Sequence, residues 1–263
     1  MHELAFVFAG FFVGVIVGLT GVGGGSLMTP ILIFFFGVKP YLAIGTDLLF
    51  AAFTKMGGTI KLARARRVDW RVVGQLCAGS IPAALLTLWV LHSLGPANAE
   101  VQHVMTTTLG AALLLTAAAT LYKVVRGKST PGAVLPGQEA AAAQPIHAAL
   151  PPLFGALIGV LVTLTSVGAG AIGVTVLMIL YPKLPLSRIV GADIAYAVPL
   201  TLVAGLGHAS LGSVDWSLLA KLLAGSIPGI WVGAHLLSHT PDRVIRSLLS
   251  VLLAYAGLKL IAL

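Results

Sequence analysis

The sequence has few charged residues, one cysteine and none of the common motifs of hydrolytic or metal-binding sites. Charged residues make up 9% of the 263 residues, compared with roughly 25% in soluble domains. The chain therefore lacks the polar groups needed to cover a surface exposed to water. With Cys77 alone, an intramolecular disulfide is excluded. No metal-ligand spacing, Gly-x-Ser-x-Gly elbow or His-Glu-x-x-His motif occurs, so we expect no catalytic group, metal or cofactor.

Apolar residues dominate what remains. They make up 58% of the sequence, and the mean hydropathy is +1.01. Most of the apolar segments approach the ~20 residues that a membrane-spanning helix needs. Two of them, 27–37 and 171–181, would reach only ~16 Å at 1.5 Å per residue. We predict an all-α, polytopic membrane protein with helices near 4–19, 27–37, 41–62, 72–92, 103–125, 147–165, 171–181, 188–211, 217–237 and 243–262.

The two halves of the sequence repeat the same motifs in the same order. The offset is 145 residues at the first match and 146 at the others. The matches are Thr20–Gly25 with Thr165–Gly170, Gly45–Asp47 with Gly191–Asp193, Val68–Trp70 with Val214–Trp216, and Ala78–Pro82 with Ala224–Pro228. We infer two copies of one unit, residues 1–125 and 147–263. Residues 126–146, rich in Pro, Gly and Ala, are interpreted as a cytoplasmic linker.

An odd number of segments in each copy predicts that the copies have inverted topology. Counting segments alternately places most of the basic residues on one side, which the positive-inside rule identifies as cytoplasmic. These residues are Arg64, Arg66, Arg67, Arg71, Lys123, Arg126, Lys128, Lys183, Arg188, Arg243 and Arg246, with Lys61 at the edge. The basic residues behind the net charge of +8 are thus explained by loops on the cytoplasmic side of a membrane. The sequence contains no nucleic-acid-binding motif. We expect a bacterial inner-membrane protein with both termini in the periplasm. The N-terminus lacks a basic region, so 4–19 is read as part of the mature protein.

Glycine-rich turns precede both half-length segments and suggest a binding site. Non-helical backbone is not tolerated against lipid, so each turn must be buried or line a cavity. The helix that follows directs free N–H groups and the positive end of its dipole at the turn, which favours an anion. The expected binding residues are Thr20, Gly21, Gly23, Gly24, Gly25, Ser26 and Thr29 in one copy, and Thr165, Ser166, Gly168, Ala169, Gly170 and Thr175 in the other. The alternative is that the glycines only allow close helix packing.

Ionisable residues within apolar segments are functional candidates. Lys55 either attracts the anion, or it pairs with a nearby carboxylate or lines the cytoplasmic mouth. Asp47 and Asp193 occupy equivalent positions and either bind a coupling proton or cation or cap their helices, with capping preferred. His208 and His235 have no counterparts in the first half, which favours a packing role; the alternative is a proton relay. Asp69 and Asp215 are expected to cap the helices that follow them.

The repeated motifs described above begin with the glycine turn Gly21–Gly25 and include Gly45-Thr46, Val68–Trp70 and Gly79–Pro82, each with its match in the second half. In their order and duplication they resemble the TauE/SafE family of sulfite exporters over nearly the whole chain outside the linker. The resemblance implies a permease for small sulfur-containing anions such as sulfite, sulfoacetate or thiosulfate. The acidic residues after Gly45-Thr46 and Gly191-Ala192 depart from the more usual neutral residue there.

The sequence thus favours a secondary transporter working by alternating access. The alternatives are an anion channel or a membrane assembly protein without transport. The expected partners are a small anion, membrane lipid and a coupling proton or cation; a homodimer stays open, and the anion and the direction are not specified.

Overall fold

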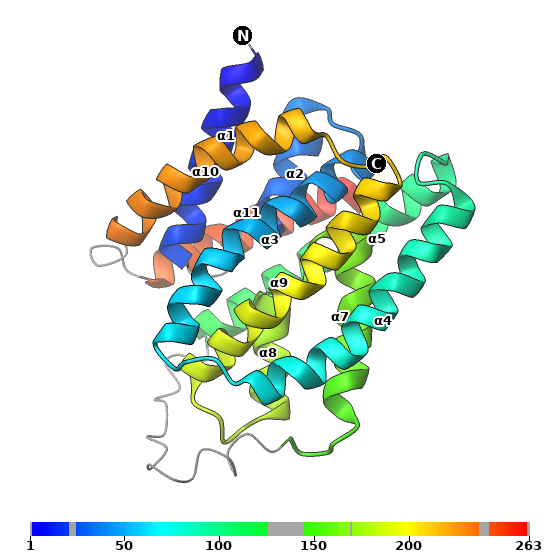
Figure 1. Ribbon diagram of the computed structural model, residues 1–263. Helices are drawn as coiled ribbons and strands as arrows, with labels where there is room; N and C mark the ends of the chain where they lie inside the picture. The colour runs from blue at the N-terminus through cyan, green and yellow to red at the C-terminus, as the bar shows by residue number, and fades with distance from the viewer. Residues whose placement is uncertain (1, 21–24, 126–144, 169, 237–241, 262–263) are drawn as a thin grey trace.

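The computed structural model describes residues 2–20, 25–125, 145–168, 170–236 and 242–261. Within these ranges the chain forms helices and no strands, so the all-α prediction is confirmed, and a helix forms at each predicted apolar segment (Figure 1). The first half contains α1 (His2–Thr20), α2 (Gly25–Phe36), α3 (Pro40–Arg64), α4 (Trp70–Leu94) and α5 (Ala99–Val125). The second contains α7 (Leu150–Thr165), α8 (Ala171–Leu180), α9 (Leu186–Ser210), α10 (Trp216–Leu236) and α11 (Asp242–Ile261). Most of the expected linker, 126–144, lies outside the described residues.

The helix lengths match the sequence pattern. Among the described helices, four are long and apolar enough to cross a membrane, within α4, α5, α9 and α10. The two half-length helices are confirmed, since α2 has 12 residues and α8 has 10. Large apolar side chains such as Phe8 and Phe12 are exposed, as the lipid-facing surface of a polytopic protein requires.

Asp69 and Asp215 begin their helices as predicted. The carboxylate of Asp69 accepts hydrogen bonds from the backbone N–H groups of Arg71 and Val72, at 3.1 and 3.3 Å. The carboxylate of Asp215 accepts one from Leu218 at 2.9 Å. Both caps satisfy amide groups that the first turn of a helix leaves without partners.

Helices of the first half pack on helices of the second half. Helix α1 packs on α10 and α7 packs on α4, while α3 packs on α9 and α5 packs on α11. Figure 1 shows α3 and α9 lying side by side across the middle of the molecule. Every one of these pairs joins a helix of the first half to a helix of the second, so neither half forms a core by itself.

Glycines create the same close approach twice, with the halves exchanged. A Cβ on Gly79 of α4 would overlap the backbone oxygen of Pro152 on α7, and a Cβ on Gly225 of α10 would overlap that of Val7 on α1. The second contact is the first with each residue replaced by its repeat equivalent. Reciprocal contacts of this kind are expected of two copies related by a twofold rotation. At these positions small residues serve helix packing.

The equivalent helices α3 and α9 run antiparallel. Gly45, near the start of α3, lies against Ser213 beyond the end of α9, while Thr59, near the end of α3, donates to the carbonyl of Ile194 at 3.5 Å. An antiparallel pair of equivalent helices is what inverted copies require. The orientation of the copies across a membrane stays a prediction.

The basic loops lie at one end of the molecule. Arg188 at the start of α9 lies 3.9 Å from the carboxylate of Asp69 at the start of α4. Beside them, the hydroxyl of Tyr181 donates to Gln75 Oε1 at 2.6 Å. Burial raises the pKa of Tyr181 to about 12, so this hydroxyl keeps its proton. The loops containing Arg64–Arg71 and Lys183–Arg188 therefore face the same side, as the charge pattern predicts.

Candidate functional site

The structure buries three charged residues in the middle of the central helix pair. Asp47 is 0% exposed, Asp193 2% and Lys55 6%. Asp47 and Lys55 belong to α3, and Asp193 belongs to α9. Because burying a charge inside a membrane protein is costly, such groups are normally paired and functional. These three residues define the charged cluster.

The preferred interpretation of the two aspartates as helix caps is wrong. Helix α3 begins at Pro40 and α9 at Leu186, so Asp47 and Asp193 are each the eighth residue of a continuous helix. At that depth the backbone N–H groups are bonded within the helix and offer nothing to a carboxylate. Both side chains point instead toward neighbouring elements.

Asp47 joins the two halves of the molecule. The hydroxyl of Thr29 on α2 donates to Asp47 Oδ2 at 2.5 Å. Ser166, in the turn before α8, also interacts with this carboxylate, although its buried Oγ does not reach hydrogen-bond geometry. Thr29 and Ser166 are expected binding residues from different copies, and the structure brings them to one carboxylate.

Lys55 interacts electrostatically with both aspartates, most strongly with Asp193. Of the two interpretations, pairing with a carboxylate is therefore the one that the structure supports. With all three groups ionised, the charged cluster carries a net charge of −1. Thr201, the repeat equivalent of Lys55, bonds the carbonyl of Ala197 in its own helix at 2.7 Å. The cluster is accordingly asymmetric, with its one cation contributed by the first half.

Asp193 lies against the second half-length helix. A Cβ on Gly173 of α8 would overlap Asp193 Oδ1, so this carboxylate lies directly against α8 at a glycine. Tyr196, one helical turn further along α9, is fully buried and interacts with Asp193. Tyr196 is not among the residues that the sequence predicts for the site. The signal for it is its spacing of three residues from Asp193, because residues three apart share a helix face.

The turn before α8 contains three residues with positive φ angles, which few residue types adopt easily. Ser166 is left-handed with φ of 61°, and Gly168 and Gly170 have φ of 132° and 143°. Such values favour glycine. The backbone N–H groups of Gly173 and Val174 bond the carbonyls of Gly168 and Gly170, at 3.1 and 2.9 Å. The turn is therefore bound to the start of α8, and the N–H groups of the first helical residues point back toward it.

Thr165 has a local role in this turn. Its Oγ1 lies 2.6 Å from the carbonyl of Leu161 and accepts from the N–H of Val167 at 3.1 Å. It therefore shapes the backbone, whereas Ser166 points to the charged cluster. Thr175 lies further along α8 and is half-buried.

The start of α2 lies close to the turn before α8. Leu27 and Val167 belong to one buried apolar cluster, and Thr29 and Ser166 both interact with the Asp47 carboxylate. That the two helix starts form a binding site stays a prediction. Gly21, Gly23, Gly24 and Ala169 lie outside the described residues, as do the side chains of Thr20 and Ser26, and Gly25 is described only as the first residue of α2.

His208 packs as expected. It is fully buried, and its Nε2 lies 2.9 Å from the carbonyl of Thr163 on α7. It also lies beside Gly45 of α3. His235 lies apart from the charged cluster, near the end of α10, where it lines a groove described below.

Comparisons with known proteins concern the family of the whole chain. The family model "Sulfite exporter TauE/SafE" matches residues 6–260. The chain is 35% identical to the probable membrane transporter protein YjnA of Bacillus subtilis (strain 168), over 98% of this chain and all of that protein. It is 28% identical to the probable membrane transporter protein YdhB of the same organism, over 95% of this chain and 97% of that protein. No solved structure matches the chain significantly.

Family and relatives are membrane transporters, and the expectation that this protein is not an enzyme is confirmed. The helices agree with a multi-pass membrane protein. With a match that extends over nearly the whole chain, the protein belongs to the TauE/SafE family of membrane transporters.

Proposed function

We propose that this protein is a secondary transporter of a small sulfur-containing anion such as sulfite, thiosulfate or a sulfonate. The anion binds between the starts of α2 and α8, beside the charged cluster, and the two inverted halves rock against each other to alternate access. The family's description as sulfite exporters supports this class of substrate.

The observation that carries the proposal is the convergence of Thr29, Ser166 and Asp47 at the centre of the molecule. Thr29 lies near the start of one half-length helix, and Ser166 lies in the turn before the other. A small anion there would meet hydroxyl groups and the N-terminal ends of two helix dipoles. The convergence comes from both halves, so a relative movement of the halves would remake the site.

The charge of the cluster implies a coupling ion. With Asp47, Asp193 and Lys55 all ionised, the net charge of −1 would repel an incoming anion. Adding one proton to a carboxylate makes the cluster neutral and lets Lys55 act on the substrate. We therefore propose that Asp47 or Asp193 takes up a proton together with the anion. A monovalent cation held by the carboxylates would have the same electrostatic effect.

Flux measurements test the proposed function. Purified protein in proteoliposomes should take up radiolabelled sulfite or thiosulfate with saturation, and unlabelled substrate inside the vesicles should accelerate the uptake by exchange. Folding is checked by anion-dependent thermal stabilisation of the same preparation across sulfite, sulfate, thiosulfate and sulfonates. Folded protein that transports none of these anions would contradict the proposal. Flux that rises linearly with concentration, without exchange, would identify a channel instead.

Replacing each carboxylate tests the coupling. Asp47→Asn and Asp193→Asn keep the side-chain size but remove the ionisable group. At the coupling residue, the replacement should abolish the acceleration of flux by an imposed pH gradient while leaving exchange of anion for anion. The other variant serves as its control. Retention of the pH-driven component in both variants would show that neither aspartate carries the proton, and sodium or potassium gradients would then be compared.

A further inference from the structure

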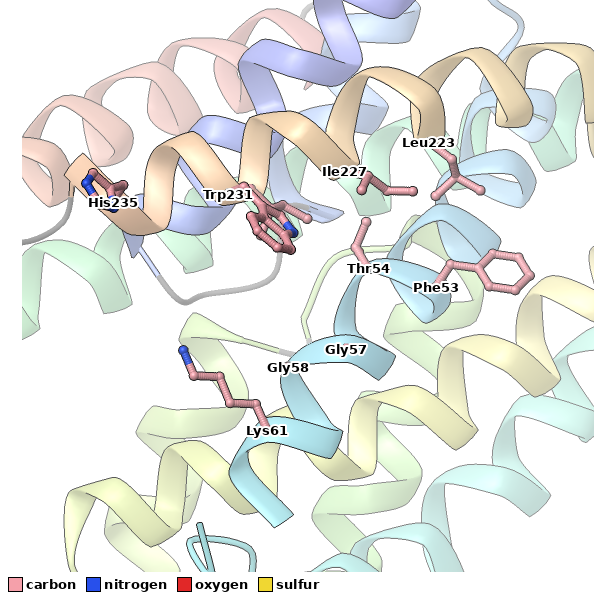
Figure 2. A pocket seen from close by; sticks show the side chains of 10 residues that line it. Phe53, Thr54, Gly57, Gly58, Lys61, Leu223, Ile227, Trp231 and His235 are labelled. Atoms are coloured by element: carbon pink, nitrogen blue, oxygen red, sulfur yellow. The ribbon is translucent and has the colours of Figure 1, made fainter. Parts of the chain in front are cut away.

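The two halves differ at the contacts of α10 with α3 and of α4 with α9. Helices α3 and α10 leave a groove with a cavity volume of about 790 Å³. Figure 2 shows Thr54, Gly57 and Lys61 of α3 on one side of it and Ile227, Trp231 and His235 of α10 on the other. We call this space the α3/α10 groove.

The equivalent space in the other half is filled. Repeat equivalence relates α3 and α10 to α9 and α4, and it relates Lys61 to Gly207. A Cβ on Gly207 would overlap the side chain of Leu88 of α4, so Leu88 fills the space between α4 and α9 at this position. On the groove side, a Cβ on Gly57 would meet nothing within 4 Å. We call the filled space the α4/α9 seam.

Cys77 gives the seam a natural reporter. Its repeat equivalent, Leu223, lines the α3/α10 groove. Cys77 itself is half-buried and close enough to Tyr196 of α9 to interact with it. Cys77 and Leu223 are both half-buried, but Leu223 borders the groove whereas Cys77 lies beside Tyr196 of the neighbouring helix.

The groove runs beside the charged cluster. Thr54 lines it, and the next residue, Lys55, is buried in the cluster. Gly58 also lines it, and a Cβ there would lie 3.7 Å from Ile194, the neighbour of Asp193. At its other end the groove reaches Lys61, one turn before the loop of Arg64–Arg71. The groove therefore connects the neighbourhood of the cluster to the face with the basic loops.

The apolar residues of the groove suit a passage that closes. The α4/α9 seam shows how the closed form is held, by apolar side chains such as Leu88 against glycine. A permanently polar wall would leave buried polar groups without partners whenever it closed. Leu223, Ile227 and Ile230 in the groove can pack in the same way once α10 approaches α3.

We propose that the α3/α10 groove is the passage between the substrate site and the basic-loop face, and that the α4/α9 seam is its closed counterpart toward the opposite face. In the second state α10 packs on α3 and the seam opens, so the two halves exchange conformations. The proposal rests on the proposed transport function. It adds the residues of the two passages and assigns this structure to the state open toward the basic loops.

Cysteine accessibility tests the first part. In a Cys77→Ser background, Gly57→Cys and Val203→Cys place a thiol at equivalent positions of the groove and the seam. A water-soluble maleimide should label Gly57→Cys about tenfold faster or more, because a minor state is typically only about 0.1–10% populated. Equal rates for the two variants would overturn the proposal. This comparison needs no substrate, so it is independent of whether the protein transports sulfite.

A disulfide across the groove tests the exchange. With Cys77 kept, Thr54→Cys and Ile227→Cys together should form a disulfide on oxidation, because the two residues face each other across the groove (Figure 2). The locked protein should lose flux reversibly, and alkylation of Cys77 should become about tenfold faster or more. Thr54→Cys alone, which cannot form the bond, is the control.

The outcomes separate the two proposals. If the wild-type protein carries flux but the locked protein transports normally, or if Cys77 alkylation is unchanged by the lock, the groove is not the passage. Failure of the disulfide to form in protein that carries flux would also overturn it. If the wild-type protein carries no anion, the transport function fails, while the labelling comparison and the response of Cys77 to the lock still decide whether the halves exchange conformations.

Discussion

At the scale of single residues, the site depends on which polar groups find partners in other helices. The hydroxyl of Thr29 reaches across to Asp47, whereas the hydroxyl of Thr201 bonds the preceding turn of its own helix. Both side chains are buried, so burial alone does not separate them. The two threonines differ in where the hydrogen-bond acceptor lies, since that of Thr29 is on another helix. Thr29 therefore connects α2 to the charged cluster.

Thr29→Val and Thr201→Val form a matched pair. Valine keeps the shape and removes the hydroxyl, so Thr29→Val leaves the Asp47 carboxylate without its short donor. We expect a loss of about 1–2 kcal/mol of stability and a large loss of flux. Thr201→Val should cost less than about 0.5 kcal/mol, because its own-helix bond is local. Thermal unfolding in detergent and flux of each variant provide the measurements; equal losses would remove the special role of Thr29.

Gly170 is the second test at this scale. With φ of 143° directly before α8, Gly170→Ala strains the turn by about 1 kcal/mol and should weaken anion-dependent thermal stabilisation severalfold. Gly95, with φ of 78° after α4, has a positive φ at a place remote from the turn. Gly95→Ala should therefore cost similar stability but leave the anion response unchanged. A reduced response in both variants would mean that strain, and not the turn, is responsible.

At the scale of helices, glycine determines how closely the two halves approach. Helix α4 contains one glycine that packs against a neighbouring helix and one that does not. Gly79 lies against the backbone of α7, while a Cβ on Gly74 would meet nothing within 4 Å. Since the first contact is with backbone atoms, no side-chain movement can relieve it.

Gly79→Ala should therefore lower stability by about 1–3 kcal/mol, because it separates α4 from α7. Gly74→Ala, five residues earlier in the same helix, should be neutral or stabilising by up to about 1 kcal/mol through helix propensity. The midpoint of thermal unfolding in detergent is the measurement. A stable Gly79→Ala protein would show that the α4–α7 contact is not as close as described.

At the scale of the whole molecule, the proposed inversion places the two Asp-Trp loops on opposite sides of the membrane. Reporter fusions at residues 69 and 215 test this directly. The fusion at 69 should be fluorescent with a cytoplasm-dependent reporter, and the fusion at 215 should be active with a periplasmic phosphatase. The exchanged fusions are the controls. Identical sidedness at the two positions would indicate a parallel repeat.

Much of the fold could be predicted because lipid restricts the choices of an apolar chain. Segment length, two glycine turns and four repeated motifs were enough to place all of the described helices, including the half-length ones, and to predict the caps at Asp69 and Asp215. The prediction that Asp47 and Asp193 cap helices is wrong, because α3 and α9 begin at Pro40 and Leu186, about two turns before the aspartates. The sequence around each aspartate is apolar, so it does not mark where the helix begins.

The helical class, the duplication and the family can be predicted from the amino-acid sequence, since each is recorded in composition or in motif order. Which helices meet is known from the tertiary structure, because membrane helices are apolar on most faces and carry no periodicity that identifies a partner. The tertiary structure brought Thr29 of α2 and Ser166 of the turn before α8 to the Asp47 carboxylate, and Asp193 of α9 to Lys55. In the tertiary structure the α3/α10 groove is open and the equivalent α4/α9 seam is filled. Both halves carry the same motif pattern, so the motifs do not predict this difference.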